Sequence, residues 1–180
     1  MILPSESTGQ ESWQHALARD ELADRLDRLF CHHLLMVHRS LAVSNRLTGT
    51  PRLLLRRPLQ RETHDHLRMA NRLAGRVTQL GGVLTADPSD LVYRAPGGSF
   101  DLPQDTSDVY SILEQALESS ATAIRAYHDL LDRIGDHDTV TRRLVEDLTA
   151  EVTTRQHESR SSLGHGSPEA GPFTTDGSAE

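Results

Sequence analysis

The chain has 180 residues, of which 36% are hydrophobic and only 4% aromatic, and it carries a formal net charge of -7. This length and hydrophobic content predict one domain with a core, and the predominance of Leu, Val and Ala favours packed helices over a β-sandwich. The negative charge argues against general binding to nucleic-acid phosphates, and the single cysteine, Cys31, excludes an internal disulfide and a cysteine-based zinc site.

The two ends of the chain are predicted to be disordered tails. Residues 1–12 are polar and lack the basic region and apolar run of a secretory signal, and residues 164–180 are rich in Gly, Ser and Pro. No stretch between them is apolar for long enough to span a bilayer. We therefore expect a cytoplasmic protein without a membrane association, with one folded domain over residues 13–163.

The first half of this domain has the hydrophobic periodicity of two helices, over about residues 13–47 and 58–80. Gly81 and Gly82 supply the left-handed cap that ends the second helix. The positions expected to face inward are Leu22, Leu26, Leu29, His33, Met36 or Val37 and Ser40 in the first helix, and Leu59, Glu62, His66, Met69, Leu73, Val77 and Leu80 in the second.

A long connection then leads to two further helices, predicted over residues 107–134 and 138–162. Three prolines prevent the connection from being one helix. The expected inward positions are Leu113, Leu117, Ser120, Ile124, Tyr127, Leu131 and Ile134 in the third helix, and Val140 or Thr141, Leu144, Leu148, Glu151 and Arg155 in the fourth. Two short connections and one long crossover predict an all-α antiparallel four-helix bundle.

The stretch "AGRVTQLGGVLTADPSD" lies at the end of the second predicted helix and the following turn, and "ALESSATAIRAYHDLLDRIGDHDTVTRRLVEDLTAE" lies in the third and fourth predicted helices. Both stretches resemble the corresponding parts of the ferritin-like superfamily, near the bacterioferritins and the Dps or Dps-like miniferritins. The similarity covers about residues 20–163. It implies a bundle with a long crossover between its second and third helices, a symmetric homo-oligomer, and ferrous iron oxidised by carboxylates and imidazoles inside the bundle.

The ligand positions that the resemblance implies are mostly changed in this chain. The Glu and His of the bacterioferritin second helix fall on His66 and Met69, and the Glu of the third helix falls on Ser120. In the fourth helix the Glu falls on Glu151, but its His partner falls on Thr154; with the register shifted by one residue, the two positions fall on Val152 and Arg155. We therefore expect the ferroxidase centre to be altered or lost.

The Dps pattern and the haem pattern are also missing. The Asp and Glu that precede the Leu-Gly-Gly turn in Dps proteins fall on Asn71 and Gly75, and the position of the bacterioferritin haem methionine lies near Leu67. Met69 is more typical of core filling than of haem ligation. No haem is expected.

A rearranged metal site is the sharper hypothesis for the bundle interior. Glu62 and His66 are four residues apart on one helical stripe, His33 lies on the stripe of the first helix and Glu151 on that of the fourth. Two imidazoles and two carboxylates suit one divalent ion such as iron, manganese or zinc.

The competing hypothesis is a structural core of ion pairs. Burying Glu62 and Glu151 is costly without a partner, and Arg72 or Arg155 can supply the opposite charge without any metal ion. Four other histidines are interpreted as solvent-facing or helix-end residues: His32, His38, His64 and His128.

The stretch from Arg46 to Arg61 is the only basic cluster, and it is interpreted as a solvated loop or an interface. As a phosphate patch it is similar to what Dps proteins need for DNA, which makes DNA binding a less favoured hypothesis. The leading prediction is an iron-binding, iron-storage or oxidative-stress protection protein whose ferroxidase centre is altered or lost. The alternative is a non-catalytic ferritin-fold scaffold or interaction protein.

Overall fold

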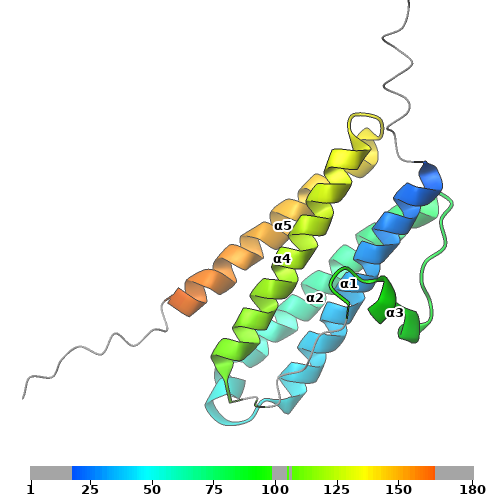
Figure 1. Cartoon of the computed structure of the whole chain (residues 1–180). Coiled ribbons are helices and arrows are strands. Elements are labelled where there is room, and N and C mark those ends of the chain that lie inside the picture. The colour runs from blue at the N-terminus through cyan, green and yellow to red at the C-terminus, as the bar shows by residue number, and fades with distance from the viewer. Residues whose placement is uncertain (1–17, 99–104, 106, 165–180) are drawn as a thin grey trace, which may run out of the picture.

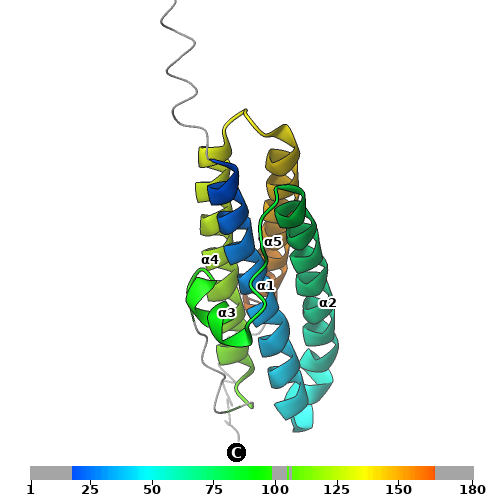
Figure 2. The same cartoon turned by 90° about the vertical axis from the view of Figure 1, so that its right-hand side faces the viewer.

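The computed structural model describes residues 18–98, 105 and 107–164, and within these ranges it contains five helices and no strand. The helices are α1 (Arg19–Arg46), α2 (Gly49–Gln79), α3 (Pro88–Arg94), α4 (Val109–Ile134) and α5 (Thr139–Gly164). Figures 1 and 2 show the antiparallel pairs α1–α2 and α4–α5 side by side, with α3 on the outside of α1. The predicted all-α four-helix bundle with a long crossover is confirmed. The predicted tail residues 1–12 and 165–180 lie outside the described residues.

The start of α2 differs from the prediction. The helix begins at Gly49, so most of the stretch expected to be a loop is helical, and Pro58 lies inside the helix rather than at its start. A proline there removes one backbone hydrogen bond. Burial offsets this loss, because Leu55 and Leu59 pack into a small apolar cluster that also contains Val43, Leu47 and Ile112.

The main core lies between the four long helices. Its fully buried members include Leu26 of α1, Leu73 of α2, Tyr127 of α4 and Leu148 of α5. The expected inward stripe of α2 is confirmed, but α4 is rotated from its expected face, because Ala123 and Leu130 are buried where Ile124 and Leu131 were expected. No helix within the described ranges is long and apolar enough to cross a membrane.

The glycine pair after α2 ends that helix as predicted. Gly81 has φ +81°, a conformation that side chains rarely adopt. Gly82 lies so close to α1 that an added Cβ would come within 2.7 Å of the Cβ of Ala23. The first glycine is needed for the turn and the second for the close approach of two helices.

A buried carboxylate attaches the crossover to α1. Asp27 is 1% exposed and accepts hydrogen bonds from the backbone N–H of Thr85 at 2.9 Å and from its hydroxyl at 2.6 Å. Arg94, at the end of α3, donates to the same carboxylate at 2.9 Å. Because α3 is attached in this way, the residues that follow it lie against α1 and α4.

Candidate functional site at the bundle centre

Three of the four predicted metal ligands lie together at the centre of the bundle. His33 of α1 is fully buried and His66 of α2 is 8% exposed, and their Nδ1 atoms are 2.8 Å apart. Glu62, one turn before His66 on α2, places its Oε1 atom 3.6 Å from Nε2 of His66. Helical periodicity predicted that each of these residues lies on the inward face of its helix, and the packing of α1 against α2 brings the two faces together.

Tyr127 of α4 completes this group and was not predicted as part of it. Its hydroxyl lies 2.6 Å from Nε2 of His33, and its side chain is fully buried. The sequence carried a signal for this role, because a buried tyrosine hydroxyl normally needs a hydrogen-bond partner and Tyr127 was already placed on the inward stripe. Burial, followed by the negative charge of Glu151, raises its pKa well above the ordinary value, so the phenol keeps its proton.

The electrostatics of this group determine the protonation states of His33 and Glu62. Burial, followed by the charges of His66, His32 and Arg155, holds the pKa of His33 well below its usual value, so the ring is neutral. Burial alone would raise the pKa of Glu62, but the hydrogen bond and charge of His66, together with Arg39 and Ser40, keep it below its usual value. The carboxylate is therefore ionised.

One proton assignment then gives every hydrogen an acceptor. The Tyr127 hydroxyl donates to Nε2 of His33, Nδ1–H of His33 donates to Nδ1 of His66, and Nε2–H of His66 points to the Glu62 carboxylate. We call these four residues the central chain. Three of the four ring nitrogens of the two histidines are hydrogen-bonded within it, and the fourth, Nε2 of His66, lies 3.6 Å from the Glu62 carboxylate.

This arrangement does not fit a di-iron carboxylate centre. A metal-bound imidazole needs a free nitrogen lone pair, and the central chain leaves none. It also contains one carboxylate, that of Glu62. Over the ranges that the structure describes, no group of three or more His, Cys, Asp and Glu side chains is placed to hold a metal ion.

The fourth predicted ligand, Glu151, lies in a cluster of arginines instead. Its two oxygens accept hydrogen bonds from Arg72 at 2.6 Å and from Arg68 at 2.8 Å. Arg155 lies 3.9 Å away and also pairs with Asp65 at 3.4 Å. This geometry agrees with the ion-pair interpretation of Glu151, in which Arg72 and Arg155 were the named partners.

The remaining histidines differ in their surroundings. His38, His64 and His128 are exposed, as expected. The prediction that His32 faces solvent is wrong, since its side chain is 3% exposed. The cause is the crossover, which covers this part of α1 and could not be placed from helical periodicity.

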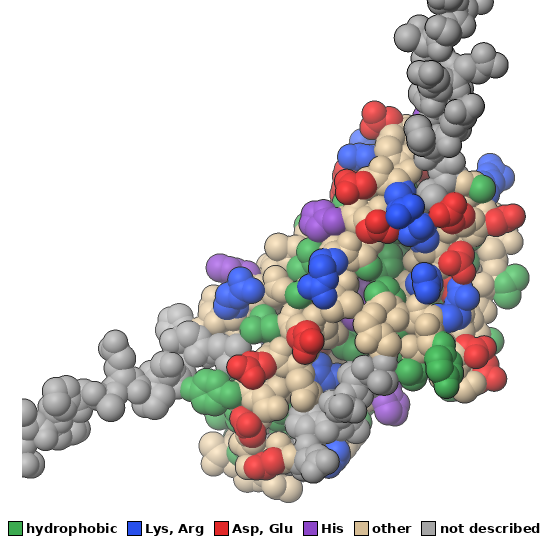
Figure 3. Space-filling model, in the orientation of Figure 1, with side chains coloured by type: hydrophobic (Ala, Val, Ile, Leu, Met, Phe, Trp, Pro, Cys, Tyr) green, Lys and Arg blue, Asp and Glu red, His purple; other side chains and the backbone are tan. Residues whose placement is uncertain are grey.

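The predicted basic stretch forms the first turns of α2. Arg52, Arg56, Arg57 and Arg61 are exposed there. On the face of the molecule shown in Figure 3, positive and negative side chains are interspersed rather than gathered by sign. DNA binding through the arginines of α2 stays a prediction.

The architecture and the sequence can now be compared with known proteins. The model of the ferritin-like domain family matches residues 23–166, which include all four bundle helices. The chain belongs to the ferritin-like domain family. No curated protein sequence matches it significantly.

Solved structures with the same fold are distant in sequence from this ferritin-like protein. The bacterioferritin-related protein of Bacteroides fragilis, described as a dodecameric thioferritin, has a TM-score of 0.77 at 21% identity over 87% of this chain and 94% of its own. The Dps protein of Vibrio cholerae O1, described as a ferritin-like diiron-carboxylate protein, has 0.72 at 17% identity over 79% and 88%. DpsC from Streptomyces coelicolor has 0.72 at 17% identity over 90% and 91%.

Proposed function

We propose that this ferritin-like protein forms a symmetric homo-oligomer that stores iron or protects against iron and peroxide, without a ferroxidase centre in its own bundle. The observation that carries this proposal is the central chain, in which both nitrogens of His33 and Nδ1 of His66 are hydrogen-bonded and Nε2 of His66 points to Glu62. The dodecameric description of the Bacteroides fragilis relative supports the assembly. Iron is then a cargo of the assembled shell.

The chemistry of the bundle centre supports the same conclusion. Ferrous iron at a ferroxidase centre is held mainly by carboxylates, which compensate its charge in the low-dielectric interior. Here the charge of Glu62 is balanced by the guanidinium of Arg39, and the neutral ring of His66 points its N–H to the same carboxylate. The charge of Glu151 is balanced by the arginines of α2 and α5. Neither carboxylate offers uncompensated charge to a cation.

Ferrous oxidation and metal content test the loss of the ferroxidase centre. Wild-type protein and His66→Ala are mixed with ferrous iron in air, and the ferric product is followed by absorbance. We expect no rate above that of buffer for either protein, and no stoichiometric metal in either purified sample. Oxidation by the wild type that is faster than in buffer and disappears in His66→Ala would contradict the proposal.

The storage role needs a separate measurement. Size-exclusion chromatography with light scattering gives the oligomer mass, and iron supplied together with peroxide is then followed through the same column. We expect a closed oligomer that carries iron with it. A monomer or dimer that elutes without iron argues against storage.

The second candidate is a ferritin-fold scaffold without metal chemistry. The cluster around Glu151 favours it, because arginines pair with the second carboxylate that a metal centre would need. An oligomer that forms normally but elutes free of iron, with or without peroxide, would select this candidate over storage.

A further inference from the structure

His32 has the hydrogen-bond arrangement of a metal-binding histidine. Its Nδ1 lies 3.3 Å from the carbonyl oxygen of Pro96, and because a carbonyl can only accept, Nδ1 carries the proton. Nε2 therefore has a free lone pair, and it is buried without a hydrogen-bond partner. Metal-binding histidines typically donate their other N–H to a backbone carbonyl or a carboxylate, which orients the ring in the same way.

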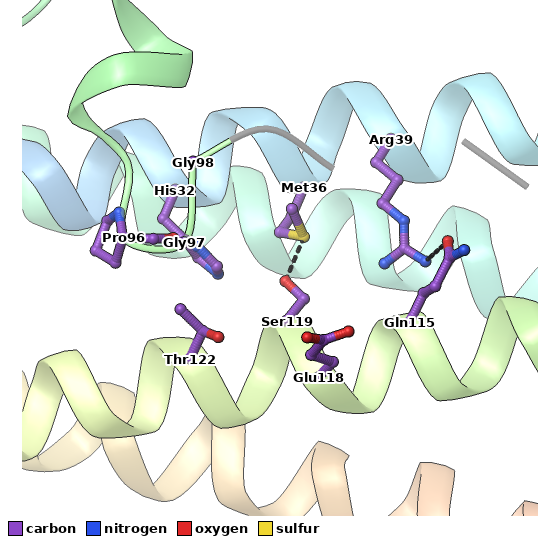
Figure 4. A pocket seen from close by; sticks show the side chains of 10 residues that line it. All are labelled: His32, Met36, Arg39, Pro96, Gly97, Gly98, Gln115, Glu118, Ser119 and Thr122. Atoms are coloured by element: carbon purple, nitrogen blue, oxygen red, sulfur yellow. Dashed lines mark hydrogen bonds between the residues drawn. The ribbon is translucent and has the colours of Figure 1, made fainter. Parts of the chain in front are cut away.

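The side chain of His32 lines a cavity of about 290 Å³ between α1, α4 and the segment that follows α3. Figure 4 shows His32, Met36 and Arg39 entering it from α1, and Glu118, Ser119 and others entering from α4. Buried polar nitrogens are rarely left unpaired, so a cavity lined by a histidine with an unpaired nitrogen is a place where a bound species is expected. The central chain lies outside this cavity, because none of its four residues lines it.

A second soft donor lies one helical turn from His32. Met36 is 4% exposed, lines the same cavity, and is four residues further along α1, which places the two side chains on one face of the helix. Its Sδ atom accepts the hydroxyl of Ser119 at 2.7 Å, and a thioether sulfur has a second lone pair. An imidazole with a thioether is a donor set that suits Cu(I) among the common metal ions.

The charges around the cavity favour an ion of low charge. Arg39 is 4% exposed and brings a guanidinium to the cavity, where it donates to Gln115 at 2.9 Å. Among the described residues, Glu118 is the one carboxylate that lines the cavity, and its charge interacts with that of Arg39. Arg39 repels a divalent ion twice as strongly as a monovalent one, and its charge is shared between Glu118 and Glu62. Iron(II) and zinc(II), which prefer several carboxylate or imidazole ligands, are disfavoured.

We propose that the cavity between α1 and α4 is a Cu(I) site in which Nε2 of His32 and Sδ of Met36 are the ligands. The site is separate from the bundle centre and from iron storage. His32 needs no proton released to bind the ion at neutral pH, because burial lowers its pKa to about 4 and the ring is already neutral. The hydroxyl of Ser119 orients the thioether from the α4 side.

Anaerobic titration of the full-length metal-free protein with Cu(I) tests the site, with a chromophoric Cu(I) chelator as competitor. We expect one ion per chain, and an X-ray absorption spectrum with one sulfur and one nitrogen neighbour. A wild-type protein that takes no Cu(I) from the chelator overturns the proposal. So does a spectrum without sulfur, because Met36 is then not a ligand. Zinc(II) that displaces the copper when equimolar overturns the choice of a soft monovalent ion.

Variants locate the ion at these two ligands. Met36→Leu keeps the volume of the side chain, and both it and His32→Gln are expected to weaken Cu(I) binding by about tenfold or more. The matched controls are Met69→Leu, a buried methionine outside the cavity, and His38→Gln, an exposed histidine of α1. Both controls are expected to bind as the wild type does. Circular dichroism shows whether each variant is folded, and full binding by folded Met36→Leu overturns the proposal.

Discussion

His32 and His33 are neighbours in the sequence and are both buried, but their surroundings are opposite. Consecutive residues of a helix point about 100° apart, so His33 faces the bundle centre and His32 faces the cavity beside α4. Their rings meet edge to face, with centroids 5.5 Å apart. Both nitrogens of His33 are engaged, whereas His32 keeps one lone pair free. Burial alone therefore does not distinguish a structural histidine from a ligand; the number of engaged nitrogens does.

Removing His33 should have the largest effect on stability. His33→Ala leaves the Tyr127 hydroxyl and Nδ1 of His66 unpaired in the core and opens a cavity, at a cost of about 4 kcal/mol. For a chain of this size that corresponds to a fall of about 12 °C in Tm. Thermal unfolding followed by circular dichroism measures it. His38→Ala, at an exposed position of α1, is the control and should change stability by less than about 0.5 kcal/mol.

Tyr127→Phe should have an intermediate effect. It removes one hydroxyl and leaves Nε2 of His33 without its donor, which costs about 2 kcal/mol. Urea unfolding of the variant beside the wild type measures the difference. An unchanged midpoint would contradict the proton assignment, because in that case the hydroxyl would not be donating to His33.

Acidification should destabilise the protein through both histidines. Burial lowers the pKa of His32 to about 4 and that of His33 below its usual value, whereas an unfolded histidine has 6.5. Below pH 6.5 the unfolded chain therefore binds more protons than the folded one, and stability falls by up to about 1.4 kcal/mol per pH unit for each histidine.

Urea unfolding at pH 7 and pH 5 checks whether the protein becomes less stable on acidification. His32→Gln should have a shallower dependence on pH than the wild type, because one of the two groups is removed. His38→Gln should keep the wild-type dependence. If the free energy of unfolding changes equally between pH 7 and pH 5 in all three proteins, His32 does not titrate as its burial requires.

The arginine cluster around Glu151 should contribute least to the free energy of unfolding, because it is partly exposed. Glu151→Gln removes the carboxylate that Arg68 and Arg72 share, and the side chain of Glu151 is 27% exposed, so solvent screening limits the loss to about 1 kcal/mol. The loss should shrink as salt is added. Glu146→Gln breaks an exposed pair with Arg142 and is the control, with a smaller effect. A loss of stability in Glu151→Gln that does not change with salt would contradict the conclusion that it comes from partly exposed ion pairs.

The structure agrees with more of the predicted fold than of the predicted site. The stripes of α1 and α2 placed His33, His66 and Glu62 correctly, because helical periodicity determines which residues share a face. Glu151 lies on its expected helix face, but Arg68 and Arg72 of α2 pair with its carboxylate. The burial of His32 was missed, since it depends on a crossover segment whose path follows from its tertiary contacts.

Residue type and spacing along the chain were enough to predict the four long helices and the glycine pair that ends α2. These features are local, because they depend on residue type and on spacing along one helix. Which nitrogen of each histidine is hydrogen-bonded, in contrast, depends on how the helices pack. A hydrogen bond between two helices depends on their relative rotation and translation to within a fraction of an ångström, and side-chain periodicity does not encode that. The free lone pair of His32 follows from that packing, and so does the closed central chain of His33.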